Sequence, residues 1–237
     1  MLKNYSATDC VSYIESNYLT INQLANQTDI SAEQIQALID HACIPKHSHS
    51  ITHEVVLQTK IFGATNIAEN ESFYYHPSLV NFAVKASQYL KSMSYIEVSE
   101  KMKSDFFNDL RQALMEVDDV KDVFDYCFDD SNNIIDAGVD KMMNEHWDYV
   151  MDGTYGVCLK NISAKNMLIK NISVAILEQW EENNQGTMNN NRRIQISHAA
   201  DLYDAVSANF GPHDVNKSTR GRLFNKFKKY LEKTAMN

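Results

Sequence analysis

The sequence predicts a mainly α-helical protein, an all-α bundle of about six helices preceded by a small helix-turn-helix and a candidate β-hairpin. Only 7 of the 237 residues are glycine and 3 are proline, so few residues can turn the chain sharply. This composition disfavours turn-rich β-sandwiches and barrels, collagen and low-complexity disorder. Apolar residues recur at helical spacing along most of the chain, and a hydrophobic content of 44% allows a substantial core.

Residues 8–44 are typical of three short helices. Thr20 and Ser31 each begin a capping box, in which the hydroxyl accepts a backbone N–H and a glutamine three residues later reaches back. The second and third helices share an apolar face, as in a helix-turn-helix. The stretch TINQLANQTDISAEQIQALIDHACIP, residues 20–45, resembles the N-terminal half of a MerR-like winged helix-turn-helix, and this resemblance implies DNA binding.

The predicted recognition helix lacks the side chains that DNA binding requires. Between Ser31 and Cys43 there is no lysine or arginine, and the charged residues are Glu33 and Asp40. Base edges and phosphates are contacted mainly by basic and amide side chains. We therefore favour a structural or protein-contact role for this module and do not expect DNA to be a partner.

A short β-hairpin is expected after these helices. Residues 54–62 (EVVLQTKIF) are rich in β-branched residues, and the FYY of residues 73–75 is placed to pair with them as a wing. The expected division is a module at residues 1–62 and a helical domain at residues 63–237. The nearby His47, His49 and His53 are metal-ligand types, but Glu54 is the only carboxylate beside them, so we predict a polar loop and no metal site.

From Pro77 onward, apolar stripes predict a series of helices. The stripes cover residues 79–90, 102–117, 120–128, 135–150, 168–180, 194–210 and 223–231. Gly153, Ser163 and Ser218 are placed to cap helix ends. Between the helices, residues 154–159 (TYGVCL) are expected to be extended, and residues 181–191 are expected to form a polar loop.

Charge and cysteine usage limit the class of protein. A net charge of −9 argues against general binding to nucleic acids or anionic membranes. No apolar run is long enough to span a bilayer, the start has no signal-peptide pattern, and the four dispersed cysteines fit a reduced, cytoplasmic protein.

The charges are unevenly distributed. Residues 97–152 carry 16 acidic and 5 basic side chains, whereas residues 212–237 carry 7 basic and 2 acidic ones. We favour a solvated acidic face on which the basic tail helix docks. The alternative is a homodimer in which the two surfaces meet.

Three stretches carry residues capable of chemistry: FYYHP (73–77), HWDYVMDGTYGVC (146–158) and GPHDVNKSTRGR (211–222). Turns at helix ends expose backbone and side chains together, and arginines at a helix start can hold a phosphate or carboxylate. The structural alternatives are a turn residue bonded to its own backbone, a packed tyrosine, and arginines paired with the acidic helices. The candidate ligand-binding residues are His76, Asp152, Tyr155, His213, Arg220 and Arg222.

Two other residues of the second stretch are assigned structural roles. His146 lies on an apolar helical stripe and is predicted to be a satisfied core histidine. Cys158 lies in the apolar context Gly-Val-Cys-Leu, which indicates a buried thiol and not a reactive thiolate. No hydrolase, zinc-protease, P-loop or dinucleotide-binding motif is present, so the sequence assigns neither a reaction nor a cofactor.

The N-terminal helices, FYYHP, the block from Trp147 to Cys158 and the block from Pro212 to Arg222 together resemble a bacterial family of unknown function, usually labelled "natural product biosynthesis protein". The resemblance covers roughly residues 15–232 and implies an accessory protein or enzyme of secondary metabolism. The leading hypothesis is a cytoplasmic protein whose small-molecule or anion pocket lies where the three stretches converge. The alternatives are a ligand-responsive transcriptional regulator and a protein-interaction module that forms a homodimer.

Overall fold

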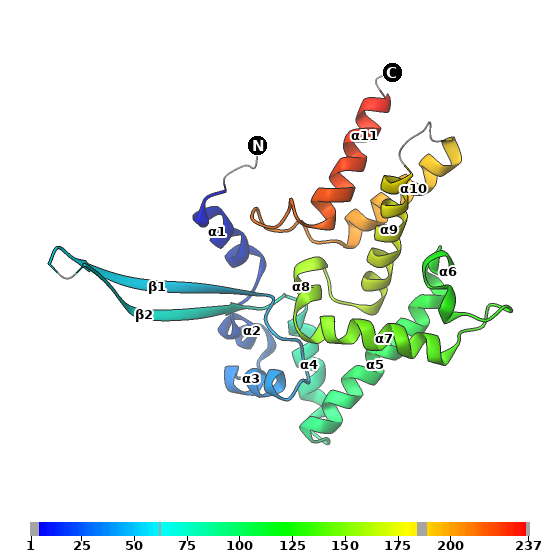
Figure 1. The fold of residues 1–237 in the computed structure, drawn as a ribbon. Coiled ribbons are helices and arrows are strands. Elements are labelled where there is room, and N and C mark those ends of the chain that lie inside the picture. Colours follow the sequence, from blue (N-terminus) through cyan, green and yellow to red (C-terminus); the bar gives the residue numbers. More distant parts are fainter. Residues whose placement is uncertain (1–4, 62, 184–188, 236–237) are drawn as a thin grey trace.

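A computed structural model describes residues 5–61, 63–183 and 189–235, and it confirms the mainly α-helical prediction (Figure 1). One long hairpin projects from the helices. The elements in chain order are α1 (Ala7–Asn17), α2 (Ile21–Thr28), α3 (Ala32–Asp40), β1 (His49–Thr59), β2 (Gly63–Tyr74), α4 (Leu79–Tyr89), α5 (Tyr95–Glu116), α6 (Val120–Val123), the 3₁₀-helix η1 (Asp125–Cys127), α7 (Asp136–Met151), α8 (Thr154–Cys158), α9 (Ala164–Glu182), α10 (Asn190–Val206), the π-helix η2 (Arg220–Phe224) and α11 (Asn225–Ala235).

The three predicted N-terminal helices are present. Thr20 forms a full capping box with Gln23, while Ser31 accepts the backbone N–H of Gln34 at 3.2 Å. Leu24 on α2 and Leu38 on α3 are fully buried in the main core, which runs without a break to Phe227 on α11. A smaller cluster of Ile14, Tyr18 and Tyr74 joins α1 to the base of the hairpin. Helices α2 and α3 therefore share a core with the rest of the chain.

The expected boundary at residue 62 falls in the turn of the hairpin, at a residue outside the described ranges. The division into two units stays a prediction.

The hairpin is much longer than predicted. Strands β1 and β2 pair antiparallel from His49 opposite Tyr74 to Thr59 opposite Gly63, with an irregularity between Val55 and Val56. The ribbon projects away from the helices (Figure 1). Polar residues along β2 concealed this strand, because a ribbon with no covering layer has no need of apolar alternation. The polar-loop prediction was wrong for two of its histidines, which lie within β1.

Two local predictions in the second half were also wrong. The stretch 120–128 is not one helix but α6 followed by η1, because the chain reverses there and the Ile135 N–H donates to the Cys127 carbonyl at 2.8 Å. The stretch 154–159 is not extended. Gly153, at φ +90°, ends α7 in the left-handed conformation, and the chain then winds straight into α8.

The C-terminal helices follow the apolar stripes with shifted ends. Helix α10 stops at Val206, four residues before the end of its stripe, because Ser207 pairs with Leu159 as an isolated β-bridge. The Ser218 hydroxyl accepts the Gly221 N–H at 3.2 Å and so caps the turn that leads into α11. Of the loop predicted at 181–191, residues 184–188 lie outside the described residues, while its flanks belong to α9 and α10.

The basic tail helix forms ion pairs with α9 and α10, outside the acidic stretch. Lys226 lies 2.5 Å from Glu181, and Lys228 lies 2.9 Å from Asp201, so these two ion pairs join α11 to α9 and α10. Within the acidic stretch 97–152, Arg111 pairs with Asp136, while Glu116 pairs with Lys165 on α9. Within the described ranges, no helix has both the length and the apolar character to cross a membrane.

Candidate functional site

The first two stretches predicted to carry chemistry pack directly on each other, and the segment before the third lies beside them. A Cβ on Gly156 would lie 2.0 Å from the Ser48 hydroxyl and 3.0 Å from Cβ of His76, so α8 packs directly on the FYYHP segment. The Ala208 N–H donates to the Cys158 carbonyl at 3.0 Å, and the Lys160 N–H donates to the Val206 carbonyl at 2.8 Å. These bonds hold residues 206–208, which precede the third stretch, beside the end of α8.

His76 is the best defined of the predicted site residues. Its side chain is buried, Nδ1 accepts the Ser78 N–H at 3.1 Å, and the ring also bonds to the backbone of Leu159. Burial lowers the pKa of His76 to about 4, although the bond to Leu159 opposes that shift. His76 is therefore neutral at pH 7, and it joins the first stretch to the second.

Aromatic and imidazole rings from three elements gather around His76. The Tyr18 ring lies 6.0 Å from the His76 ring and 4.4 Å from the His49 ring, and the His49 ring lies 6.3 Å from that of His213. The Tyr18 hydroxyl donates to the Gly156 carbonyl at 3.2 Å. We call this group the junction, defined by Tyr13, Tyr18, His49, His76 and His213.

The junction is electrically neutral over most of its extent. Burial, helped by the nearby His213, lowers the pKa of His49 to about 4. Burial also raises the pKa of Tyr18 well above its usual range. His213, at the solvent side, lies 3.1 Å from the Asp214 carboxylate. Two buried polar atoms here, Nε2 of His49 and the hydroxyl oxygen of Ser48, have no hydrogen-bond partner among the described residues.

A pocket of about 170 Å³ opens beside the junction. Its polar lining residues are Tyr13, Asn17, Tyr18, His76, Lys160 and Asn209. They come from α1, from the segment before α4, and from the segments after α8 and α10. We call it the junction pocket.

The other predicted residues have different surroundings. The Tyr155 hydroxyl lies 2.8 Å from Nδ1 of His146, and Asn171 donates to it at 3.4 Å. Burial raises the pKa of Tyr155 to about 12. His146 is half-buried in this contact, so it is a hydrogen-bonded histidine on the side of α7 that faces α9. Asp152 is exposed and accepts the Thr154 N–H at 2.8 Å as a local turn residue.

Arg220 is a buried structural residue. Its guanidinium donates to the carbonyls of Ala208 at 2.8 Å and Ser207 at 2.9 Å, and to the Asp204 carboxylate at 2.6 Å. The aspartate lies on α10 and not on the acidic helices. Arg222, two residues later, is exposed, and no ion pair or hydrogen bond of its side chain is found within the described part of the chain.

Sequence reasoning missed Tyr13 and Tyr18, and it assigned His49 to a polar loop. No motif marks them, because a tyrosine on α1 and a histidine on β1 gain their roles only when the hairpin base packs on α1. Cys158 carries no sign of reactivity, since burial raises the pKa of its thiol. Among the residues that the structure describes, no group of three His, Cys, Asp or Glu is placed to hold a metal ion.

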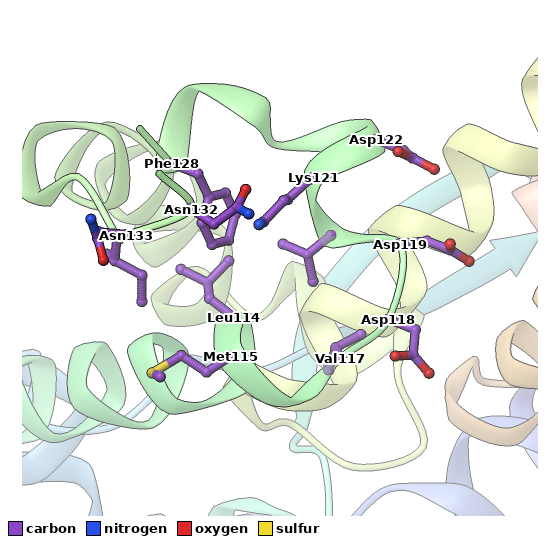
Figure 2. A pocket seen from close by; sticks show the side chains of 12 residues that line it. Leu114, Met115, Val117, Asp118, Asp119, Lys121, Asp122, Phe128, Asn132 and Asn133 are labelled. Carbon is purple, nitrogen blue, oxygen red and sulfur yellow. The ribbon is translucent and has the colours of Figure 1, made fainter. Parts of the chain in front are cut away.

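A larger pocket, of about 630 Å³, lies at the C-terminal end of α5, between α6 and the turn that follows η1 (Figure 2). Its rim carries Asp118, Asp119 and Asp122, and its interior includes Lys121 and Phe128. We call it the acidic pocket. The sequence placed acidic residues in this region but gave no sign of a cavity.

The chain belongs to a family of unknown function, DUF6058, whose sequence profile matches residues 102–232. This range contains the whole acidic pocket and the part of the junction pocket that follows α8 and α10. Helices α1 to α4 and the hairpin precede it. No curated protein and no solved structure matches the chain.

Proposed function

We propose that this protein binds a small, uncharged, hydrogen-bonding molecule in the junction pocket. The observation that carries the proposal is the polar lining of this pocket, in which the predicted site residue His76 lies together with Tyr13, Tyr18 and Asn209. The His49 ring, whose Nε2 has no hydrogen-bond partner among the described residues, lies 4.4 Å from the Tyr18 ring of the lining, and buried polar atoms are normally paired with protein, water or a ligand.

The charges around the pocket favour a neutral ligand over an anion. His49 and His76 are uncharged at pH 7 because their pKa values are about 4. Arg220 is buried and does not line the pocket, and its guanidinium donates to two carbonyls and one carboxylate. Lys160, the one cation in the described lining, donates to the Asp204 carbonyl at 2.5 Å. The remaining polar groups of the lining are phenols and amides, which can both donate and accept hydrogen bonds.

The size of the pocket restricts the ligand further. Pockets for drug-sized molecules are typically about 300–1,000 Å³, so about 170 Å³ accommodates a small molecule or one end of a longer one. A role in secondary metabolism, as the resemblance to "natural product biosynthesis" proteins implies, is part of this proposal.

The test compares two molecules of the same shape and different charge. Benzamide and benzoate are titrated into the ¹⁵N-labelled chain while amide resonances are followed by NMR. We expect benzamide to shift resonances of the junction at millimolar concentration and benzoate to bind at least about ten-fold more weakly, because His76 is neutral and the Lys160 ammonium is already bonded to the Asp204 carbonyl.

Two variants locate the binding. Asn209→Trp, at the rim, should abolish the benzamide shifts, whereas Asn144→Trp, on the exposed surface of α7, should leave them unchanged. Tighter binding of benzoate or of inorganic phosphate would overturn the neutral-ligand assignment. If none of the three probes changed the chemical shifts of junction residues, the proposal of a binding site here would be wrong.

A further inference from the structure

The acidic pocket has a composition that suits a second kind of ligand. Leu114 and Val120 in its floor are buried, while Met115 at its edge is 80% exposed, which is unusual for so large an apolar side chain. The three aspartates of the rim are exposed. A pocket of about 630 Å³ falls within the range of small-molecule sites, and this one offers an apolar surface beneath a negative rim.

The walls of the acidic pocket are held by local hydrogen bonds. Asp129 accepts the N–H groups of Ser131 at 2.9 Å and Asn133 at 2.8 Å. Asn132 adopts φ +68° and Asp119 adopts φ +58°, left-handed conformations that asparagine and aspartate tolerate better than most residues. The turn after η1 and the turn before α6 therefore have defined shapes without a ligand.

Lys121 places a cation against an aromatic ring in this pocket. Its ammonium lies 5.1 Å from the centroid of the Phe128 ring, a cation–π distance. Figure 2 shows the lysine directed toward Phe128 and Asn132, away from the three aspartates. Within the described residues, Asp118, Asp119 and Asp122 form no ion pair. The ring face thus holds a cation, while the three carboxylates, directed away from that ring in Figure 2, have no cation paired with them among the described residues.

We propose that the acidic pocket binds an organic ammonium ion with an alkyl body. The ammonium is attracted by Asp118, Asp119 and Asp122, and the alkyl chain covers the apolar surface between Leu114 and Met115. The rim carries three negative charges against the single positive charge of Lys121, and residues 97–152 as a whole carry 16 acids against 5 bases. Such a field favours cations and repels anions.

Lys121 is a built-in competitor in this arrangement. It places a like charge in the pocket and occupies the aromatic face that a ligand cation would use. Removing its charge while keeping its stem should therefore strengthen ammonium binding. This prediction distinguishes a cation site from a nonspecific apolar groove, in which the charge of Lys121 would have no effect on ligand preference.

The experiment uses three six-carbon probes with the full chain: hexylammonium, 1-hexanol and hexanoate. Binding is followed by NMR shifts of residues in the acidic pocket at low salt and again at 0.5 M NaCl. We expect hexylammonium to bind at least about five-fold more tightly than hexanol, hexanoate not to bind, and the preference to shrink at high salt.

Three variants sharpen the test. Lys121→Met should tighten hexylammonium binding about two- to five-fold, and adding Phe128→Leu should reverse part of that gain. The double change Asp118→Asn with Asp119→Asn should weaken binding about three- to ten-fold, because it removes two negative charges. Asparagine tolerates the left-handed backbone conformation of Asp119, so the turn should keep its shape. Asp148→Asn, on the exposed side of α7, is the matched control and should have no effect.

Circular dichroism is used to check that each variant is folded. Lys121 is exposed, so Lys121→Met should fold normally and keeps the proposal testable even if Phe128→Leu, at a half-buried position, does not fold. Equal binding of hexanol and hexylammonium, or weaker ammonium binding by Lys121→Met, would overturn the proposal. Concentration-dependent dimerisation that hexylammonium inhibits would instead assign the pocket to basic residues of a second copy. The outcome is independent of the junction pocket, which lies elsewhere on the molecule and is tested with other probes.

Discussion

Replacing Arg220 by methionine should destabilise the fold by about 2–3 kcal/mol. Methionine keeps the apolar stem over the Tyr203 and Phe224 rings, whose centroids lie 5.5 and 5.0 Å from the guanidinium carbon, but it removes all three hydrogen bonds. Each buried carbonyl that loses a donor costs about 1 kcal/mol. The carbonyl of Ala208 keeps one donor, the Ser207 hydroxyl at 3.3 Å, which reduces its cost.

Loss of the bond to Asp204 contributes less to the destabilisation of the Arg220→Met variant. The aspartate side chain is half exposed, so water replaces the lost partner, and we assign this ion pair up to about 1 kcal/mol. Arg220 also holds the pKa of Asp204 below its usual value, so the variant should raise that pKa toward the ordinary one.

Urea unfolding followed by circular dichroism measures the loss. With an m-value of roughly 3 kcal/mol/M, a loss of 2–3 kcal/mol lowers the midpoint by about 0.7–1 M. Arg222→Met is the matched control, because Arg222 is exposed, and its effect should stay within about 0.5 kcal/mol. Equal midpoints for the two variants would refute the structural role of Arg220. If the wild-type chain bound phosphate and Arg220→Met lost that binding at unchanged stability, the result would instead support the prediction that Arg220 is an anion-binding residue.

Three further outcomes are expected. Gly156→Ala should cost about 1–3 kcal/mol, because its Cβ would lie 2.0 Å from the Ser48 hydroxyl oxygen, and Ser48→Ala should recover part of that loss in a double-mutant cycle; full additivity of the two changes would contradict the contact. His76 has a folded pKa of about 4, below its unfolded value near 6.5, so its contribution of about 3 kcal/mol is complete above pH 6.5 and is lost as the pH falls toward 4. An NMR titration checks this, and a ring midpoint above pH 6 would show the burial argument to be wrong. Random duplex DNA at low salt should not be retarded by the protein in a gel, since the exposed charges of α3 are Glu33 and Asp40; salt-dependent retardation would support the regulator hypothesis.

Helix positions were predictable because their signals are local. Apolar stripes located α4, α5, α7, α9, α10 and α11, and the hydroxyls of Thr20, Ser31 and Ser163 cap helices as expected. Where the local pattern failed, another part of the chain competed for the same backbone. The stripe that ends at Phe210 continues past Val206, but Ser207 leaves the helix to pair with Leu159. The stripe over 120–128 is interrupted in the same way by the pairing of Phe128 with Ile134.

The predicted site residues show the same limit. The sequence marked Arg220 as a helix-start arginine suited to an anion, yet three acceptors near Ala208 occupy its guanidinium. It marked Asp152 as either a ligand residue or a turn residue, and the bond from the Thr154 N–H supports the turn. Residue type and spacing state what a side chain can bind. They do not state which acceptors the fold brings within reach.

The sequence by itself determined the helical class, the caps, the acidic middle and the three stretches around the scarce glycines and prolines, because each depends on neighbours only a few residues apart. Tertiary structure alone decided the length of the hairpin, the packing of His49 on Tyr18, the fate of Arg220 and the existence of both pockets. These features depend on contacts between residues far apart in the chain, such as the 138 positions that separate Tyr18 from Gly156. Such contacts form only when the whole core is assembled, so no local pattern can encode them.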